Sequence, residues 1–338
     1  MPIIRSFDNA YTVTDYTDTI IQIPNTWGLI NEMGIFSPEG VSQHSITVES
    51  QGSTLGLIGD KARGERNNVG RDFLREMRSF PIPHFPYDDA VKPNDVQGKR
   101  AFNSPDAPET TDAVVARKLE YIRRNQAITL EFARAQALTQ GTVYAPNGTV
   151  SVNYYTDFGV TRKEIDFTLG TATAPIIAKS EEALAHIQDN TLTGEVVTGV
   201  VVLCSPEFFS KLIDNASVKE AYKFYTSTQE PLRTRLGSGV YRRFVHGSVE
   251  YVEYRGSYNG VALIPAGDAY MIPTGTSDTF KTYFSPANHF DYVNTIGEQV
   301  YAWSFRNQSN TEITLQSESN FLNLIRRPQC VVRLFSSN

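Results

Sequence analysis

The chain has 338 residues, of which 40% are hydrophobic and 20% are charged, an ordinary composition for a chain that buries its own core. Its 31 Lys and Arg residues stand against 37 Asp and Glu, for a net charge of −6. Tight nucleic-acid binding needs a basic excess, so DNA is excluded as the primary ligand. No run of about 18 apolar residues predicts a membrane span, and no signal peptide is recognised at the N-terminus.

The first 35 residues contain short apolar pieces that Gly and Pro interrupt. Ile20-Ile21-Gln22-Ile23-Pro24 and Trp27-Gly28-Leu29-Ile30 are the clearest of them. Such a pattern is not typical of the opening of a compact domain. It predicts an arm that docks onto another surface.

Residues 45–80 alternate polar and apolar at first, in Ser45 to Glu49, which predicts a strand. Five glycines and a mixture of acidic and basic side chains follow, up to Phe80-Pro81-Ile82-Pro83. Two strands joined by a glycine-rich, charged tip describe a long projecting hairpin. A loop of this length without a core of its own is usually functional, but composition leaves a solvated surface loop equally open.

Apolar residues at steps of three and four predict a long helix over residues 109–140. Asp106, followed by Glu109, resembles a capping box, and Gly141 is a natural stop. The helix would be about 48 Å long, which suits a strut. A second apolar stripe through Tyr121 predicts contacts on more than one face.

The remaining pattern mixes strands and helices. Asn147-Gly148 predicts a hairpin turn, and Ser205-Pro206 predicts a helix start after a buried strand. The predicted strands are 149–154, 199–204, 248–254, 261–264, 311–316 and 329–334, and the predicted helices after the strut are 174–187 (ending near Asn190), 206–213 and 218–225. Helices and strands are segregated rather than strictly alternating, so the fold class is α+β.

No residues are predicted to be catalytic, cofactor-binding or metal-binding. The five histidines are scattered, and no HExxH, GxSxG or GxxxxGK[ST] motif occurs. Gly237-Ser238-Gly239 lacks the third glycine of a dinucleotide fingerprint and is interpreted as a turn. Cys204 and Cys330 abut apolar runs and are interpreted as buried free thiols, with a nucleophilic Cys204 as the alternative. The pair Asp88-Asp89 is interpreted as a solvated turn.

Six segments, in order along residues 20 to 335, are similar to the major capsid protein E family of tailed phages, the lambda type. They are Ile23-Pro24-Asn25 to Phe36, Ile46-Thr47-Val48-Glu49 to Gly64, Phe80-Pro81-Ile82-Pro83 to Arg100, Ile264-Pro265-Ala266-Gly267 with Pro273-Thr274-Gly275, Phe280-Lys281-Thr282-Tyr283 to Ala287, and Gly297-Glu298. The resemblance implies the Hong Kong 97-type capsid fold. It assigns 1–44 to an N-terminal arm, 45–83 to an extended loop, 84–169 to a peripheral domain with a spine helix, 170–290 to an axial domain and 291–338 to a return to the peripheral domain.

The resemblance implies a major capsid protein that self-assembles, as hexamers and pentamers, into an icosahedral head shell around double-stranded DNA. Portal, scaffold and decoration proteins would be further partners, DNA would be contacted non-specifically, and assembly would take place in the host bacterial cytoplasm. Six residues of the arm and loop are predicted to contact neighbouring copies: Trp27, Lys61, Arg63, Glu65, Arg66 and Arg71. The alternatives are an encapsulin-like nanocompartment shell, a phage tail or decoration protein, and a hydrolase.

Overall fold

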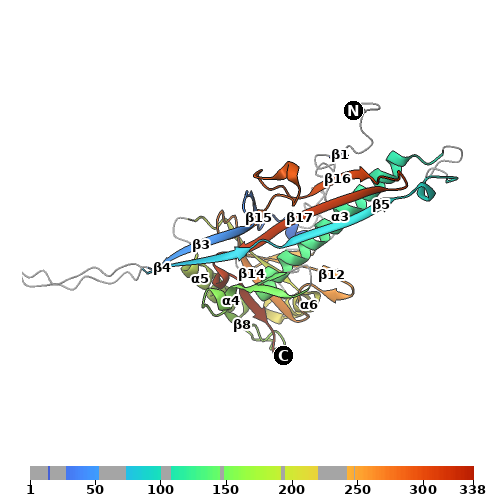
Figure 1. Ribbon diagram of the computed structural model, residues 1–338. Coiled ribbons are helices and arrows are strands. Elements are labelled where there is room, and N and C mark those ends of the chain that lie inside the picture. The colour runs from blue at the N-terminus through green and yellow to red at the C-terminus, as the bar shows by residue number, and fades with distance from the viewer. Residues whose placement is uncertain are drawn as a thin grey trace, which may run out of the picture.

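Two six-stranded sheets and one long helix between them build the molecule (Figure 1). This computed structural model describes residues 14–15, 28–52, 74–99, 108–144, 148–191, 195–219, 242–246 and 248–338. The chain combines helices with mainly antiparallel sheets, which fits the predicted α+β class.

Strand β17 (Ile313–Ile325) organises the first sheet. Its first half pairs with β16 (Tyr301–Arg306) on one side and β5 (His84–Val91) on the other, and its second half pairs with β15 (Phe280–Phe284). The edge strands are β1 (Thr14–Asp15) and β2 (Ser37–Gly40). The predicted strand at 311–316 is therefore only the start of a strand of 13 residues. Asp88 and Asp89 lie within β5 rather than in a turn, and Asp89 pairs with Lys118 at 2.7 Å.

The predicted strut is α3 (Thr111–Gln140), which is about 45 Å long at 1.5 Å per residue. Its N-cap is Thr110, whose side chain accepts a hydrogen bond from the Ala113 amide, so the prediction of Asp106 as the cap was wrong. Gly141 ends the helix in the left-handed conformation (φ 68°), as predicted. The second apolar stripe is not wholly buried, since Tyr121 is exposed.

The second sheet follows the order β10 (Arg243–His246), β11 (Val249–Glu253), β9 (Gly199–Cys204), β14 (Asp268–Thr274), β18 (Val332–Phe335) and β8 (Glu164–Asp166). Helices α5 (Ile176–Asn190) and α6 (Pro206–Asp214) pack against it. Ser205 caps α6 by accepting from the Phe208 amide at 3.2 Å, as predicted. Strand β18 lies in this sheet, away from β16 and β17, although the three strands belong to one predicted segment, 291–338.

The remaining described elements are short. They are α2 (Leu29–Glu32), the two-stranded ribbon of β3 (Ser45–Gly52) and β4 (Leu74–Pro81), the hairpin of β6 (Thr142–Tyr144) and β7 (Val150–Asn153), α4 (Tyr154–Asp157), the hairpin of β12 (Ser257–Tyr258) and β13 (Val261–Ala262), and the 3-10 turns η1 (Pro93–Asp95), η2 (Phe290–Tyr292) and η3 (Pro328–Cys330). Of the predicted helix 218–225, residues 218 and 219 are described and are helical, and the rest lies outside the described residues, as does Gly237-Ser238-Gly239.

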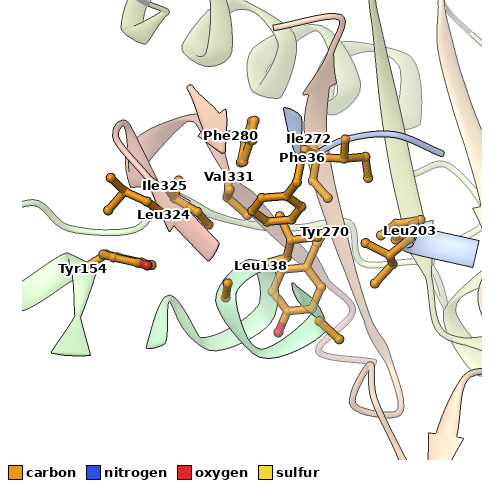
Figure 2. Close-up of a cluster of buried hydrophobic side chains, with 14 of the residues drawn as sticks. Phe36, Leu138, Tyr154, Leu203, Tyr270, Ile272, Phe280, Leu324, Ile325 and Val331 are labelled. Carbon is orange, nitrogen blue, oxygen red and sulfur yellow. The ribbon is translucent and has the colours of Figure 1, made fainter. Parts of the chain in front are cut away.

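A single hydrophobic cluster joins the two sheets through α3 (Figure 2). Phe280 and Leu324 reach it from the first sheet, Leu203 and Tyr270 from the second, and Leu138 from α3. Strand β9 is buried on both faces, because its alternate residues enter this cluster and a second one beneath α5 and α6. That double burial explains its unbroken apolar run. Cys204 and Cys330 are buried free thiols, as predicted.

Part of the predicted arm packs in the body of its own subunit instead of docking onto another surface. Leu29, Ile30, Ile35 and Phe36 are each at most 3% exposed and pack in the protein's own core cluster. Strand β2 then pairs in parallel with β15. Residues 28–40 are therefore part of the body of the subunit, and the sequence pattern missed this because short apolar pieces between Gly and Pro look alike in an arm and in a core.

Candidate assembly surfaces

The β3–β4 ribbon extends the chain away from both sheets (Figure 1). Eight residue pairs, from Ser45 opposite Pro81 to Gly52 opposite Leu74, make it about 27 Å long at 3.4 Å per residue. The predicted hairpin is thus present in its described part. Its extent also excludes the alternative of a plain surface loop for residues 45–52 and 74–81.

Of the ribbon side chains that the structure describes, Phe80 at the root is the most deeply buried, and Ile46 and Val48 are partly buried against the same cluster. Phe80 is 3% exposed, and its ring lies 6.1 Å from Tyr154 and 5.7 Å from Phe158. Three residues further out, Met77 is 69% exposed. A two-stranded ribbon is marginally stable by itself in water, so its outer part is suited to lie on another surface.

None of the residues predicted to contact neighbouring copies can be placed. All six, Trp27, Lys61, Arg63, Glu65, Arg66 and Arg71, lie outside the described residues. In the sequence, five of them lie between the end of β3 at Gly52 and the start of β4 at Leu74.

An ordered loop around η2 presents a second exposed surface, which sequence reasoning missed. Phe290 is 94% exposed, Val293 60% and Ile296 72%. The loop is held by its ends: Asn288 donates to Glu318 at 2.8 Å, and Gly297 donates to the Val41 carbonyl at 3.0 Å. These exposed apolar side chains make the loop a candidate contact surface, although no periodic pattern singles out these positions in the sequence.

The most buried charged residue that the structure describes lies on α3, and it too went unnoticed in the sequence. Glu131 is fully buried and accepts hydrogen bonds from the backbone amides of Ile30 (3.0 Å) and Asn31 (2.9 Å) and from the Tyr254 hydroxyl (2.7 Å). Burial raises the pKa of its carboxyl group, against the lowering effect of these donors. One turn on, burial lowers the pKa of Arg134 to about 10.

The described surface offers little for catalysis. Among the residues that the structure describes, no group of three His, Cys, Asp or Glu side chains is placed to hold a metal ion. A hollow of about 910 Å³ on the second sheet contains Arg162, Glu164, Asp268 and Arg333, which pair with one another. Burial raises the pKa of the Cys204 thiol well above its ordinary value, which disfavours the nucleophilic thiolate. No helix in the described ranges has the length and apolar character needed to cross a membrane.

Comparisons with known proteins agree on one family for this chain. The family model described as phage major capsid protein E matches residues 12–336. The major capsid protein of Pseudomonas phage KPP10 is 45% identical over 98% of both chains, and that of Salmonella phage Felix O1 is 27% identical over 97% of both. The capsid of Myoviridae phage XM1 superposes with a TM-score of 0.55 at 9% identity, covering 91% of both chains.

These matches confirm the predicted fold class, the Hong Kong 97-type capsid fold. The nanocompartment alternative has less support, because the curated relatives are phage capsid proteins. With nearly its whole length matched by the family model and a relative at 45% identity, the chain belongs to the phage major capsid protein E family.

Proposed function

We propose that this chain is the shell-forming subunit of a tailed-phage head, which self-assembles as hexamers and pentamers into an icosahedral shell around double-stranded DNA. The observation that carries the proposal is the β3–β4 ribbon, a projecting element of a capsid-family protein that is anchored by Phe80 and exposes Met77 further out. The subunit acts through the surfaces it shares with other copies and has no catalytic role.

The outer ribbon, residues 60–78, lies across a neighbouring subunit in this proposal. Met77, on the outer part of β4, is 69% exposed and needs a surface to cover it. Residues 53–73 contain both acidic and basic side chains, including the predicted contacts Lys61, Arg63, Glu65, Arg66 and Arg71. Charges of both signs set the register of such a contact and disfavour wrong pairings. Trp27 is proposed to contact a neighbour from the arm.

The proposed domains are those that the family resemblance implies, with the arm's docking on neighbours confined to residues before 28. The first sheet with α3 would form the peripheral part, and the second sheet the axial part at the centre of a capsomer. Each contact is weak, and many of them together hold the shell. The exposed loop around Phe290 would be covered by another copy.

We also propose that the shell assembles in the host bacterial cytoplasm. Portal, scaffold and decoration proteins are its further partners in this proposal. The net charge of −6 supports a non-specific contact with packaged DNA, because a mildly acidic wall does not bind the genome tightly.

Deleting residues 53–70 tests the function. We expect a soluble, folded subunit that forms no shells, because the packed root around Phe80 remains while the outer ribbon is lost. Electron microscopy of the purified full-length chain should show closed particles, and circular dichroism should show that the deletion keeps the native fold. Normal particles from the deleted chain would refute the role of the ribbon.

A further inference from the structure

An exposed aromatic ring and a hollow adjoin each other on the loop around η2. Residues 288–296, called the η2 loop here, carry Phe290, which is 94% exposed. The same loop borders a hollow of about 200 Å³ that Ser42 and His44 also line. We infer that the ring and the hollow meet between copies, with Phe290 of one subunit inserted into the hollow of a second subunit. The inference rests on the proposed function, because it needs copies that assemble.

The η2 loop holds the Phe290 ring out of the hollow of its own chain. Its backbone forms a 3-10 turn, in which the Tyr292 amide donates to the His289 carbonyl at 3.0 Å. The centre of the Tyr292 ring lies 4.7 Å from that of Tyr301 and 6.2 Å from that of Trp303, so the turn is anchored on two buried residues of β16. A side chain on a fixed turn loses little conformational freedom when a partner covers it.

The hollow has the size and the lining that an aromatic ring needs. Its lining is mostly apolar and includes Pro286, Ala287 and Tyr292, together with the imidazole of His44. An apolar cavity of about 150 Å³ binds benzene, so a hollow of about 200 Å³ accommodates the Phe290 ring. In the free subunit the ring and the hollow both contact water, and joining them removes apolar surface of both from water.

The charges beside the ring and the hollow are complementary as well. Asp291 follows Phe290 directly, and its side chain is 75% exposed. The hollow is lined by two imidazoles, those of His44 and His289, of which His44 is exposed and has its Nδ1 3.2 Å from the Ser285 hydroxyl. An acidic side chain next to the ring and imidazoles around the hollow favour the pairing of ring with hollow over the pairing of two rings.

A second copy is the occupant because the ring and the hollow belong to one chain. Each subunit then gives one ring and receives one, which closed pairs and closed rings of identical subunits require. The hollow also lies where the chain enters the ribbon, since Ser42 and His44 come directly before β3. The contact would therefore continue the surface that the β3–β4 ribbon presents to neighbouring copies.

A double-mutant cycle on the association of the full-length chain tests the inference. Phe290→Ala removes the ring, and Ser42→Trp fills the hollow from an exposed position. Sedimentation velocity measures the concentration at which subunits associate. We expect each variant to raise that concentration roughly 10- to 150-fold, the effect of leaving one Phe side chain exposed. The double variant should raise it no further, because either substitution alone already removes the contact.

Mixing the two variants gives a second readout. The Ser42→Trp chain keeps its ring and the Phe290→Ala chain keeps its hollow, so an equimolar mixture should associate at a lower concentration than either variant alone. Both positions are exposed, so the Tm of each variant should match that of the unmodified chain. Val261→Ala is the matched control. Val261 is 70% exposed on β13, and its effect on the association free energy should be additive with that of Ser42→Trp.

Two results would overturn the inference: a double variant whose effect is the product of the two single effects, or a mixture that associates no better than either variant. The ring and the hollow would then meet different partners. Closed particles in electron microscopy are the separate readout of the proposed function. Subunits that associate as the cycle predicts but form no closed particles would refute the proposed function alone, and a chain that does not associate at any concentration would refute both.

Discussion

Phe80→Ala should destabilise the subunit at the root of the ribbon. The ring is 3% exposed and packs on Tyr154 and Phe158 within the cluster that joins the two sheets. Removing a buried Phe side chain costs about 3–5 kcal/mol. With an unfolding entropy of about 2.1 cal/mol/K per residue, the 338 residues have about 0.7 kcal/mol/K, so the Tm should fall by about 4–7 °C.

Differential scanning calorimetry of the subunit measures this change, and Met77→Ala is its control. Met77 lies on the same strand but is 69% exposed, so its truncation should change stability by less than about 0.5 kcal/mol. The reasoning fails if Phe80→Ala lowers the Tm no more than Met77→Ala does, because the ring would then not anchor the ribbon. Electron microscopy of Phe80→Ala would show whether a loosened root also lowers particle yield.

Two further predictions concern charge. Arg66→Glu should slow assembly, and the effect should be stronger at low ionic strength, where salt screens charge–charge interactions less. Light scattering at two salt concentrations measures the assembly rate. An assembly rate that changes with neither the substitution nor the salt concentration would contradict the prediction. Hydrogen bonds from Arg242, with those from Arg255, lower the pKa of Glu253, so its contribution to stability is complete above the ordinary Glu pKa and is lost as pH falls through the lowered value. Glu253→Gln should therefore cost about 1 kcal/mol at pH 7, since both arginines are partly exposed, and less at pH 3, which urea unfolding at the two pH values would show; an equal cost at both would count against the ion pair.

Local sequence patterns predicted several helix ends correctly. The stop of α3 at Gly141 and the start of α6 at Ser205-Pro206 follow from the conformational freedom of glycine and from side-chain capping, which depend on a few neighbouring residues. The start of α3 was misplaced because Asp106 and Thr110 both match the cap pattern, and only the folded chain selects between them.

The surfaces were predictable only in part. The strand pattern of 45–49 and the glycine-rich charged stretch after it indicated a projecting hairpin, and β3 and β4 form its described part. The exposed loop around Phe290 could not be found in the same way. Apolar residues are normally expected inside, and whether a given one is covered depends on where the chain returns in space.

By itself the sequence determined the fold class, the strut, the hairpin and the family, since each rests on a local pattern or on ordered segments along the chain. Tertiary structure alone decided that residues 28–40 belong to the body, that β17 is long enough to serve three partners, and that Glu131 is buried beneath Gly28. The physical reason is that burial and pairing join residues about 100 positions apart, as in Ile30 and Glu131, and no periodicity within a short window records such a contact.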